Sequence, residues 1–483
     1  MMLPVSEISR IPAHVSIVFI CKDLKTLPTG YFSAEELQFI KKWNKEDKKE
    51  FFSFNRLNSW NFVQIVPQEK DPFKRNESLR KSGDSLSSAL NENKSREVIL
   101  YNAGVTPEEF LAWAEGLILG NYQFIQYKTG DEKKHTLEKV SVYSPKMPAE
   151  WLDYLNVTCK AVYKCRDLIN EPNSYLTAGV FADEVEKLAH DAGAFAEVLK
   201  LKKIETLKMG GLLAVNKGSQ EPPVFMILEW KPQKPVNKNP YVFVGKGITF
   251  DSGGMNLKPG DSMYTMKDDM SGAAAVATAV CAVAEARLPV HVVGLIPATD
   301  NRPGPNAIVP GDVIKMYSGL NVEVANTDAE GRLILADALH YAKKFNPALV
   351  VDLATLTGAA QRAVGRYGIV AMQVKAEKEL EDLKRSGWEV FERLVEFPAW
   401  EEYGEWIKSD IADIKNSGVA EAGAITAGKF LERFTDYPYI HLDIAGTAFL
   451  DKKDSYRGQA GTGTGVRLIF DFIRHIALAK QNI

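Results

Sequence analysis

Short apolar runs alternate with longer segments of helical spacing along the first 145 residues. Two helices are predicted to begin at SAEE (residues 33–36) and TPEE (residues 106–109), because Ser or Thr followed three residues later by Glu forms a capping box. The polar segment at residues 67–95 mixes acidic with basic side chains, so it is interpreted as a solvated loop with a surface helix. Strands are predicted at three apolar runs, residues 15–21, 62–66 and 98–101.

A long helical pattern runs from about Trp151 to Ile169 and ends at the turn sequence EPN of residues 171–173. Beyond it, almost continuously apolar strands alternate with helices. Such strands indicate a mostly parallel sheet that is covered on both faces. The predicted strands are residues 224–228, 241–244, 290–295 and 348–352, and the predicted helices are residues 271–286 and 333–344.

These patterns predict an α/β protein of two domains. A smaller N-terminal α/β domain, with a role in assembly or regulation, takes residues 1–150, and a linker helix takes residues 151–172. The larger C-terminal domain takes residues 173–483 and is expected to hold a mostly parallel central sheet flanked by helices. Ligands of such sheets lie at the carboxyl ends of the strands, which makes the strand ends the expected place for a site.

Composition narrows the classes of function. Of the 483 residues, 45% are hydrophobic and 25% are charged, and the formal net charge is -3, so neither nucleic acid nor a membrane is an expected partner. No apolar run is long enough to span a bilayer, and the run at residues 15–21 lacks the basic flank of a signal peptide. The cysteines show no C-x-x-C spacing, which favours buried, reduced thiols in a cytoplasmic protein: Cys21, Cys159, Cys165 and Cys281.

Acidic residues gather between residues 245 and 332, beside strongly apolar runs. Carboxylates placed against buried strands are costly unless they are paired or bind a cation. Four carboxylates would neutralise two divalent ions at the spacing of paired hydrolytic sites. Oxygen ligands suit Mn, Mg or Co, and Zn is also compatible. The stretch therefore predicts a two-metal hydrolytic centre with Asp251, Asp269, Asp328 and Glu330.

Several of these residues also have a simpler explanation. Asp328, Glu330 and Arg332 are spaced by two, which places them on one face of an extended segment. The sequence TDAE at residues 327–330 is also a capping box for a helix that begins at the next residue, and the two interpretations can coexist. Asp269 precedes a predicted helix, and its simpler explanation is an N-cap or an acid of the first turn.

Two lysines lie close to these acids in the sequence. Lys246 stands five residues before Asp251 and forms a salt bridge in the simpler interpretation. Near two cations its ammonium would be expelled or deprotonated, and a neutral amine could then serve as a ligand. Lys258 lies in a loop and is by default an exposed lysine, but it could polarise a substrate carbonyl or stabilise an oxyanion. The residues alone leave both alternatives open.

At these positions the sequence resembles the leucyl aminopeptidase family, the dimetal cytosol aminopeptidases. The resemblance covers about residues 150–483, and NTDAEGRL at residues 326–333 is a long and highly specific match. The first 145 residues fit the family's variable N-terminal domain only in length and pattern. The other matching segments are GKGITFDSGG (residues 245–254), LKP (257–259), DMSGAA (269–274), ATLTGA (354–359), HLDIAGTA (441–448) and residues 461–468.

The resemblance implies a metal-binding role for five residues. Asp251 and Glu330 would each contact both metal ions. Asp328 would complete one metal site, and Lys246 with Asp269 would complete the other. Two divalent ions per subunit are therefore expected, Mn or Zn, with Mg or Co as further candidates.

The resemblance also implies catalytic and substrate-binding residues. Lys258 would polarise the peptide carbonyl, and Arg332 would hold a bicarbonate that acts as the general base. Asp268 stands where relatives often have Ala, and it either alters the metal preference or faces solvent, while Asp300 replaces a commonly longer Glu. Relatives are typically homohexamers of two stacked trimers. The pocket for the first substrate side chain is implied at Met266, Thr355, Leu356, Gly358, Ala445 and Ala448.

The expected function is metal-dependent hydrolysis of the N-terminal peptide bond by a water that two metal ions activate. The expected substrates are peptides with a free N-terminus and a Leu-like apolar first residue. One alternative is a regulatory or DNA-associated protein of the same fold that needs no turnover, although the net charge and the lack of a clear basic stripe count against it. The other alternative is a dimetal hydrolase that acts on other amides.

Overall fold

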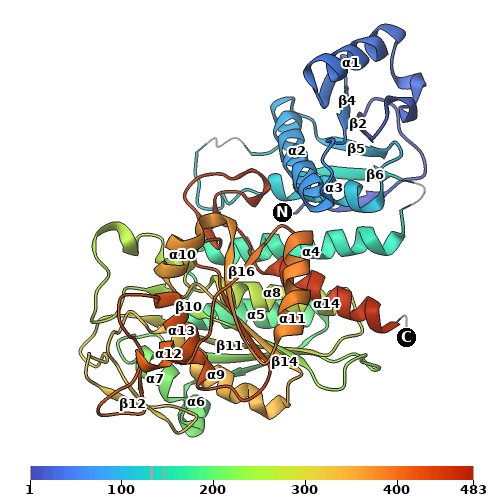
Figure 1. Ribbon diagram of the computed structural model, residues 1–483. Helices are drawn as coiled ribbons and strands as arrows, with labels where there is room; N and C mark the ends of the chain where they lie inside the picture. Colours follow the sequence, from blue (N-terminus) through green and yellow to red (C-terminus); the bar gives the residue numbers. More distant parts are fainter. Residues whose placement is uncertain (1, 131–133, 145–146, 482–483) are drawn as a thin grey trace. The chain divides into compact units, whose positions relative to one another are not determined.

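The computed structural model describes residues 2–130, 134–144 and 147–481, and the chain divides into two compact units (Figure 1). Unit 1 contains the residues up to Tyr163 together with Lys453–Gly458, and unit 2 contains the rest. The division falls inside helix α4 (Ala149–Asn170), which confirms the helix predicted between Trp151 and Ile169. The domain limits at residues 150 and 172 stay a prediction. Within the described ranges, no helix is both long and apolar enough to cross a membrane.

Unit 1 is built on a sheet whose strands run mostly parallel. The strand order is β1-β6-β5-β2-β4-β3, and the pair at the β3 edge is antiparallel. The strands predicted at residues 15–21, 62–66 and 98–101 are confirmed as β2, β4 and β5. The bounds are β1 (Val5–Glu7), β2 (Ser16–Cys21), β3 (Phe51–Asn55), β4 (Trp60–Ile65), β5 (Glu97–Asn102) and β6 (Lys139–Tyr143).

Helices α1 (Ala34–Asp47) and α3 (Pro107–Gly120) begin at the two predicted capping boxes, which the structure confirms. In the first box, the Ser33 hydroxyl accepts a hydrogen bond from the Glu36 amide, and the Glu36 carboxylate accepts one from the Ser33 amide. The second box repeats this arrangement, with proline at the first helical position, where its missing N–H costs nothing.

Helix α2 (Pro72–Glu92) shows that the interpretation of residues 67–95 as solvated is wrong for one helix face. This face packs on α3 so closely that a Cβ at Gly83 would lie 2.2 Å from a main-chain oxygen of α3. Arg80 is buried on it, and its Nε donates to the Glu115 carboxylate at 2.5 Å. The composition of residues 67–95 does not reveal this buried face, because a charged side chain such as Arg80 is paired with a residue of α3 instead of with water.

A segment from near the C-terminus, Lys453–Gly458, folds as part of unit 1. It contains the short turn η7 (Ser455–Arg457), which contacts α2 and α3. Tyr456 is fully buried there, and its hydroxyl donates to the Glu77 carboxylate of α2 at 2.7 Å. Unit 1 is therefore completed by residues that are distant in the sequence.

Unit 2 confirms the predicted sheet. Among the described residues, nine strands form it: eight in the order β16-β15-β18-β14-β9-β11-β8-β7, with β10 paired to β11. The central strands β18, β14, β9 and β11 are parallel, while β15 and β8 run antiparallel to them. The bounds are β7 (Phe195–Leu199), β8 (Val224–Trp230), β9 (Tyr241–Gly245), β10 (Gly247–Asp251), β11 (Val292–Asn301), β14 (Leu349–Ala354), β15 (Ile369–Val374), β16 (Leu394–Glu396) and β18 (Tyr439–Asp443).

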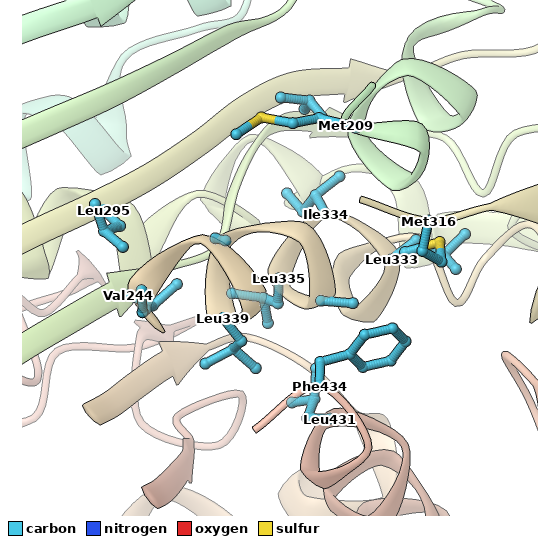
Figure 2. Packing of buried hydrophobic residues seen from close by; sticks show 14 of the residues in the cluster. Met209, Val244, Leu295, Met316, Leu333, Ile334, Leu335, Leu339, Leu431 and Phe434 are labelled. Carbon is cyan, nitrogen blue, oxygen red and sulfur yellow. The ribbon is translucent and has the colours of Figure 1, made fainter. Parts of the chain in front are cut away.

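Helices cover both faces of this sheet, as predicted (Figure 1). The small side chains of α8 let it approach the strands, since a Cβ at Gly245 would lie 2.5 Å from the Cα of Ala273. On the other face, apolar side chains of α9 fill the space between the sheet and α13 (Figure 2). One face carries α5 (Ala178–Ala192), α8 (Ser271–Glu285) and α14 (Val466–Gln481), and the other carries α7 (Gly210–Asn216), α9 (Gly331–Ala342) and α13 (Gly423–Glu432).

Helix α9 also buries the carboxylate of Asp337 in this core. The carboxylate accepts hydrogen bonds from the Leu212 amide at 3.0 Å and from the Tyr317 amide at 2.9 Å. Burial nevertheless raises the pKa of Asp337 from 3.8 to about 7. Because the pKa is higher in the folded state, the proton on this group contributes stability that is complete below about pH 4 and is lost as the pH rises through 7.

We expect the contribution of Asp337 to the free energy of unfolding to fall by about 1.4 kcal/mol per pH unit between pH 3.8 and about 7, the pKa values of this group in the unfolded and folded states. Asp337→Asn cannot ionise and should lack the component. Urea unfolding of both metal-free proteins from pH 4 to 8 measures it as a pH-dependent difference between them. A difference that stays constant across this range would contradict the assignment.

Candidate metal centre

The predicted site residues meet at the carboxyl ends of the central parallel strands. Lys246 directly follows β9, Asp251 ends β10, and Thr355 directly follows β14. Glu330 and Asp269 lie where α9 and α8 begin on the two faces of the sheet. Four of these five residues are buried, so the strands and helices bring charged side chains into a largely dry region.

Three of the predicted carboxylates converge. Asp251, Asp328 and Glu330 each offer an oxygen that lies within 4.8 Å of the others. The local structure behind this convergence differs from both interpretations of residues 327–330. The Ala329 amide donates to the carbonyl of Asn326 at 3.2 Å, so the segment is a turn and not extended.

The capping box predicted at residues 327–330 is wrong. Glu330 is the N-cap residue of α9 and already has helical backbone angles, with φ -76° and ψ -37°, and no side-chain cap is formed there. The Thr327 hydroxyl instead donates to the carbonyl of Gly253 and accepts from the Asn256 amide. These bonds tie the turn to the loop after β10, which brings Asp328 beside Asp251.

Lys246 is buried among the acids, with 3% of its side chain exposed. Its ammonium lies 2.7 Å from the Asp269 carboxylate and 2.9 Å from that of Glu330, and it donates to the carbonyl of Thr355. Burial alone lowers the pKa of this amine, but Asp269 and Glu330 raise it above its ordinary value. The salt bridge of the simpler interpretation is therefore present, and the ligand role stays a prediction.

Lys258 is not the exposed lysine of the default interpretation. Only 15% of its side chain is exposed, and Nζ lies 2.8 Å from an oxygen of Asp251 and 2.8 Å from an oxygen of Asp328. The loop that carries it folds back on itself, because the Lys258 amide donates to the carbonyl of Ser252. Burial lowers the pKa of this lysine, but the surrounding acids raise it above the ordinary value.

Asp269 is not the N-cap of α8, since Met270 takes that position. The Asp269 carboxylate accepts from Lys246 and from the Thr355 hydroxyl through the same oxygen. Asp268 does not face solvent, because it is 8% exposed and burial raises its pKa to about 7. A link between Asp268 and metal preference stays a prediction.

The donor set fits divalent metal ions. Oδ2 of Asp269 and Oε2 of Glu330 are buried and have no hydrogen-bond partner among the described residues. Burial raises the pKa of Asp251 to about 6, and Glu330 adds to this shift. Unsatisfied buried carboxylate oxygens are costly, and a bound dication removes that cost. Four carboxylates and one amine suit ions of the Mn and Zn class.

Arg332 lies in the first turn of α9 and is buried. Its Nη1 donates to the carbonyl of Asn416 at 2.7 Å, while Nε has no hydrogen-bond partner within the described part of the chain. Burial lowers the pKa of the guanidinium to about 10, so it stays charged at neutral pH. Such a group is an open donor for an anion.

The structure brings part of the predicted substrate pocket together around Asp443. Its buried carboxylate accepts from the amides of Leu356 and Ala445 and from the Thr357 hydroxyl. Thr355, which directly precedes Leu356, donates its hydroxyl hydrogen bond to the Asp269 carboxylate of the candidate metal centre. The remaining pocket residues are the half-buried Met266 in η4 (Met266–Asp268), the exposed Gly358 at the start of α10 (Gly358–Val364), and the buried Ala448.

Sequence reasoning did not single out three residues that hold the centre together. The Asn301 amide donates to Asp251 at 2.8 Å, Asp443 anchors the pocket, and Asn416 contacts the turn that carries Asp328. Asp443 lies inside the matching segment HLDIAGTA, which offered a signal. Asn416 follows the unremarkable sequence DIK, which offered none.

Comparisons with known proteins agree on one family. Residues 163–470 match the model of the cytosol aminopeptidase family, catalytic domain. A probable cytosol aminopeptidase of Geobacter sulfurreducens is 45% identical over 408 residues, which cover 82% of this chain and 81% of the relative. A probable cytosol aminopeptidase of Desulfotalea psychrophila is 38% identical over 463 residues, which cover 93% of this chain and 91% of the relative.

Solved structures extend the similarity to almost the full chain. The bottromycin maturation enzyme BotP in complex with Mn matches with a TM-score of 0.85 and 29% identity, covering 96% of this chain and 100% of BotP. A mutant of tomato leucine aminopeptidase matches with a TM-score of 0.84 and 27% identity, covering 98% of this chain and 96% of the tomato chain.

Proposed function

Because the chain belongs to the cytosol aminopeptidase family and is a hydrolase of the aminopeptidase type, we propose that it removes Leu-like apolar residues from the N-termini of peptides with the help of two divalent ions. The observation that carries this proposal is the convergence of the carboxylates of Asp251, Asp328 and Glu330. In addition, Oδ2 of Asp269 and Oε2 of Glu330 are buried without a hydrogen-bond partner among the described residues. The proposed metal-binding residues are Lys246, Asp251, Asp269, Asp328 and Glu330.

The ions supply Lewis acidity and lower the pKa of a water molecule to near neutrality. The protein's own residues supply the rest. The Lys258 ammonium lies at the edge of the carboxylate cluster, within 2.8 Å of Asp251 and Asp328. A peptide carbonyl that enters the cluster meets this donor, which stabilises the negative charge that develops on the oxygen during attack.

Arg332 would hold a bicarbonate, which would supply a general base beside the metal-binding residues. The buried guanidinium supports this role, because its Nε has no hydrogen-bond partner among the residues that the structure describes and an anion would accept from it. Proton transfer by a positioned base contributes on the order of 100- to 10,000-fold to the rate. The first side chain of the substrate would lie against Met266, Thr355, Leu356, Gly358 and Ala445.

The metals, the assembly and the location are proposed from the family. Mn is supported by the solved complex of BotP with Mn, with Zn as the other main candidate and Mg or Co after them. A homohexamer in the cytoplasm is proposed, and the four buried cysteines of the described chain fit a reducing compartment.

A pair of substrates tests the proposal. We expect leucyl amide to be hydrolysed, and N-acetyl-leucyl amide to be hydrolysed at least about 100-fold more slowly, because acetylation removes the free amine that orients the substrate. Removing the divalent ions with a chelator should abolish turnover, and adding Mn should restore it.

The outcomes separate the alternatives. Equal hydrolysis of the two amides would favour a dimetal hydrolase that acts on other amides. Full turnover after complete metal removal, confirmed by elemental analysis, would overturn the proposal itself.

A further inference from the structure

Asn416 lies directly after the short strand β17 (Ile414–Lys415) and is fully buried. β17 pairs with β13 (Asn321–Glu323). The main-chain N–H of Asn416 continues this pairing by donating to the carbonyl of Glu323 at 2.9 Å. The side chain is thereby fixed beside the turn that follows β13 and leads into α9. This turn carries two of the proposed metal-binding residues.

The Asn416 side chain hydrogen-bonds both ends of that turn. Its Oδ1 accepts from the amides of Ala325 and Asn326, at 2.8 Å and 3.2 Å. Its Nδ2 donates to the carbonyls of Asn326 and Ala329, at 2.7 Å and 3.3 Å. The side-chain amide of Asn416 thus accepts two hydrogen bonds and donates two, which is the full number that this group can form. Asp328 lies inside the bracketed segment, and Glu330 directly follows it.

The main chain of Asn416 makes a separate contact, because its carbonyl oxygen accepts from Nη1 of Arg332 at 2.7 Å. One buried residue therefore touches the segment around Asp328 and Glu330 through its side chain, and Arg332 through its backbone. This separation matters for an experiment: replacing the side chain releases the turn and leaves the backbone contact to Arg332 available.

The turn needs such a constraint. Asp251, Asp328 and Glu330 carry like charges with oxygens within 4.8 Å of one another, and repulsion between them favours spreading apart. An amide side chain can hold N–H and C=O groups of the turn at once, whereas a carboxylate would place an oxygen against the carbonyls of Asn326 and Ala329. We propose that Asn416 is a positioning residue for metal binding, a proposal that rests on the function proposed above.

The test compares Asn416→Ala and Asn416→Asp with a matched control, Asn237→Ala. Asn237 is 4% exposed and also in unit 2. Its Oδ1 accepts from the His291 amide, and its Nδ2 donates to the carbonyls of Asn239 and His291. The variant therefore loses comparable hydrogen bonds before the first residues of β9 and β11, whereas Lys246 follows the last residue of β9. Thermal unfolding of the metal-free proteins reports the structural cost of each change.

We expect both Asn416 variants to bind Mn about 10- to 100-fold more weakly in a calorimetric titration, as for other residues that orient metal ligands. The control should keep the Mn affinity of the wild type at a similar loss of melting temperature. At saturating Mn, kcat of the Asn416 variants should stay at least about 10-fold low, with a smaller change in KM.

Unchanged Mn affinity in Asn416→Asp, or an equal loss in Asn237→Ala, would overturn the proposal. The aspartate variant differs from the wild type only by an oxygen in place of NH2, so it keeps the test open if the alanine variant does not fold. Failure of the proposed function would look different, because the wild-type protein itself would then bind no Mn.

Discussion

Replacing Glu330 with alanine is expected to abolish hydrolysis of leucyl amide and to lower the bound metal. Glu330 is buried, lies 2.9 Å from the Lys246 ammonium, and keeps its second oxygen without a hydrogen-bond partner among the described residues. Removing it leaves Lys246 with one fewer counter-charge and deprives both proposed metal positions of an oxygen. The loss of kcat/KM should be at least about 1,000-fold, measured together with metal content by elemental analysis.

Asp337→Asn is the matched control for this variant. Asp337 lies on the same helix, is equally buried, and is bonded to main-chain amides instead of the metal-binding residues. The control should keep its metal and most of its activity. If Glu330→Ala retained full turnover after its metal had been removed, the carboxylate cluster would not be the catalytic centre.

Lys258→Met is expected to lower kcat for leucyl amide by about 100- to 1,000-fold, the usual loss when one donor to a developing oxyanion is removed. Metal binding should be retained or strengthened. The reason is that the Lys258 ammonium now lies 2.8 Å from Asp251 and from Asp328, where it competes with a dication for the same oxygens. Methionine keeps the length of the side chain and removes the charge.

Lys429→Met provides the comparison, because Lys429 is also a buried, ion-paired lysine, held by Glu432 and Glu401 outside the metal centre. It should lose stability without the selective fall in kcat. A Lys258→Met enzyme with normal kcat would show that the Lys258 ammonium does not stabilise the developing oxyanion.

Most of the fold could be predicted from the sequence, because the strands and helices of its core are apolar throughout. The strands predicted at residues 241–244 and 348–352 and the helix at 271–286 are all present, since parallel strands buried on both faces leave few polar interruptions. The burial of one face of α2 could not be predicted in this way. Arg80 on this face pairs with Glu115 of α3, a contact between two helices that no local sequence pattern records.

The sequence predicted which types of residue form the candidate site better than it predicted how they are arranged. The prediction that carboxylates meet held for Asp251, Asp328 and Glu330, although the spacing by two was not the reason, since a turn brings them together. The exposed position that is the default for a loop lysine is wrong for Lys258, because a loop sequence does not show that the loop folds back over the acids. Asn416 was missed because its importance lies in hydrogen bonds to main-chain atoms 87 to 91 positions away.

The segment Lys453–Gly458 limits how freely this molecule can be divided. Recombination or truncation that swaps the N-terminal unit for that of another relative would strip Tyr456 of the helices α2 and α3 that enclose it and leave the Glu77 carboxylate without this hydroxyl partner. The two halves of the gene are therefore not independent modules. The six-residue segment Lys453–Gly458 has to evolve in step with the helices α2 and α3 that it contacts.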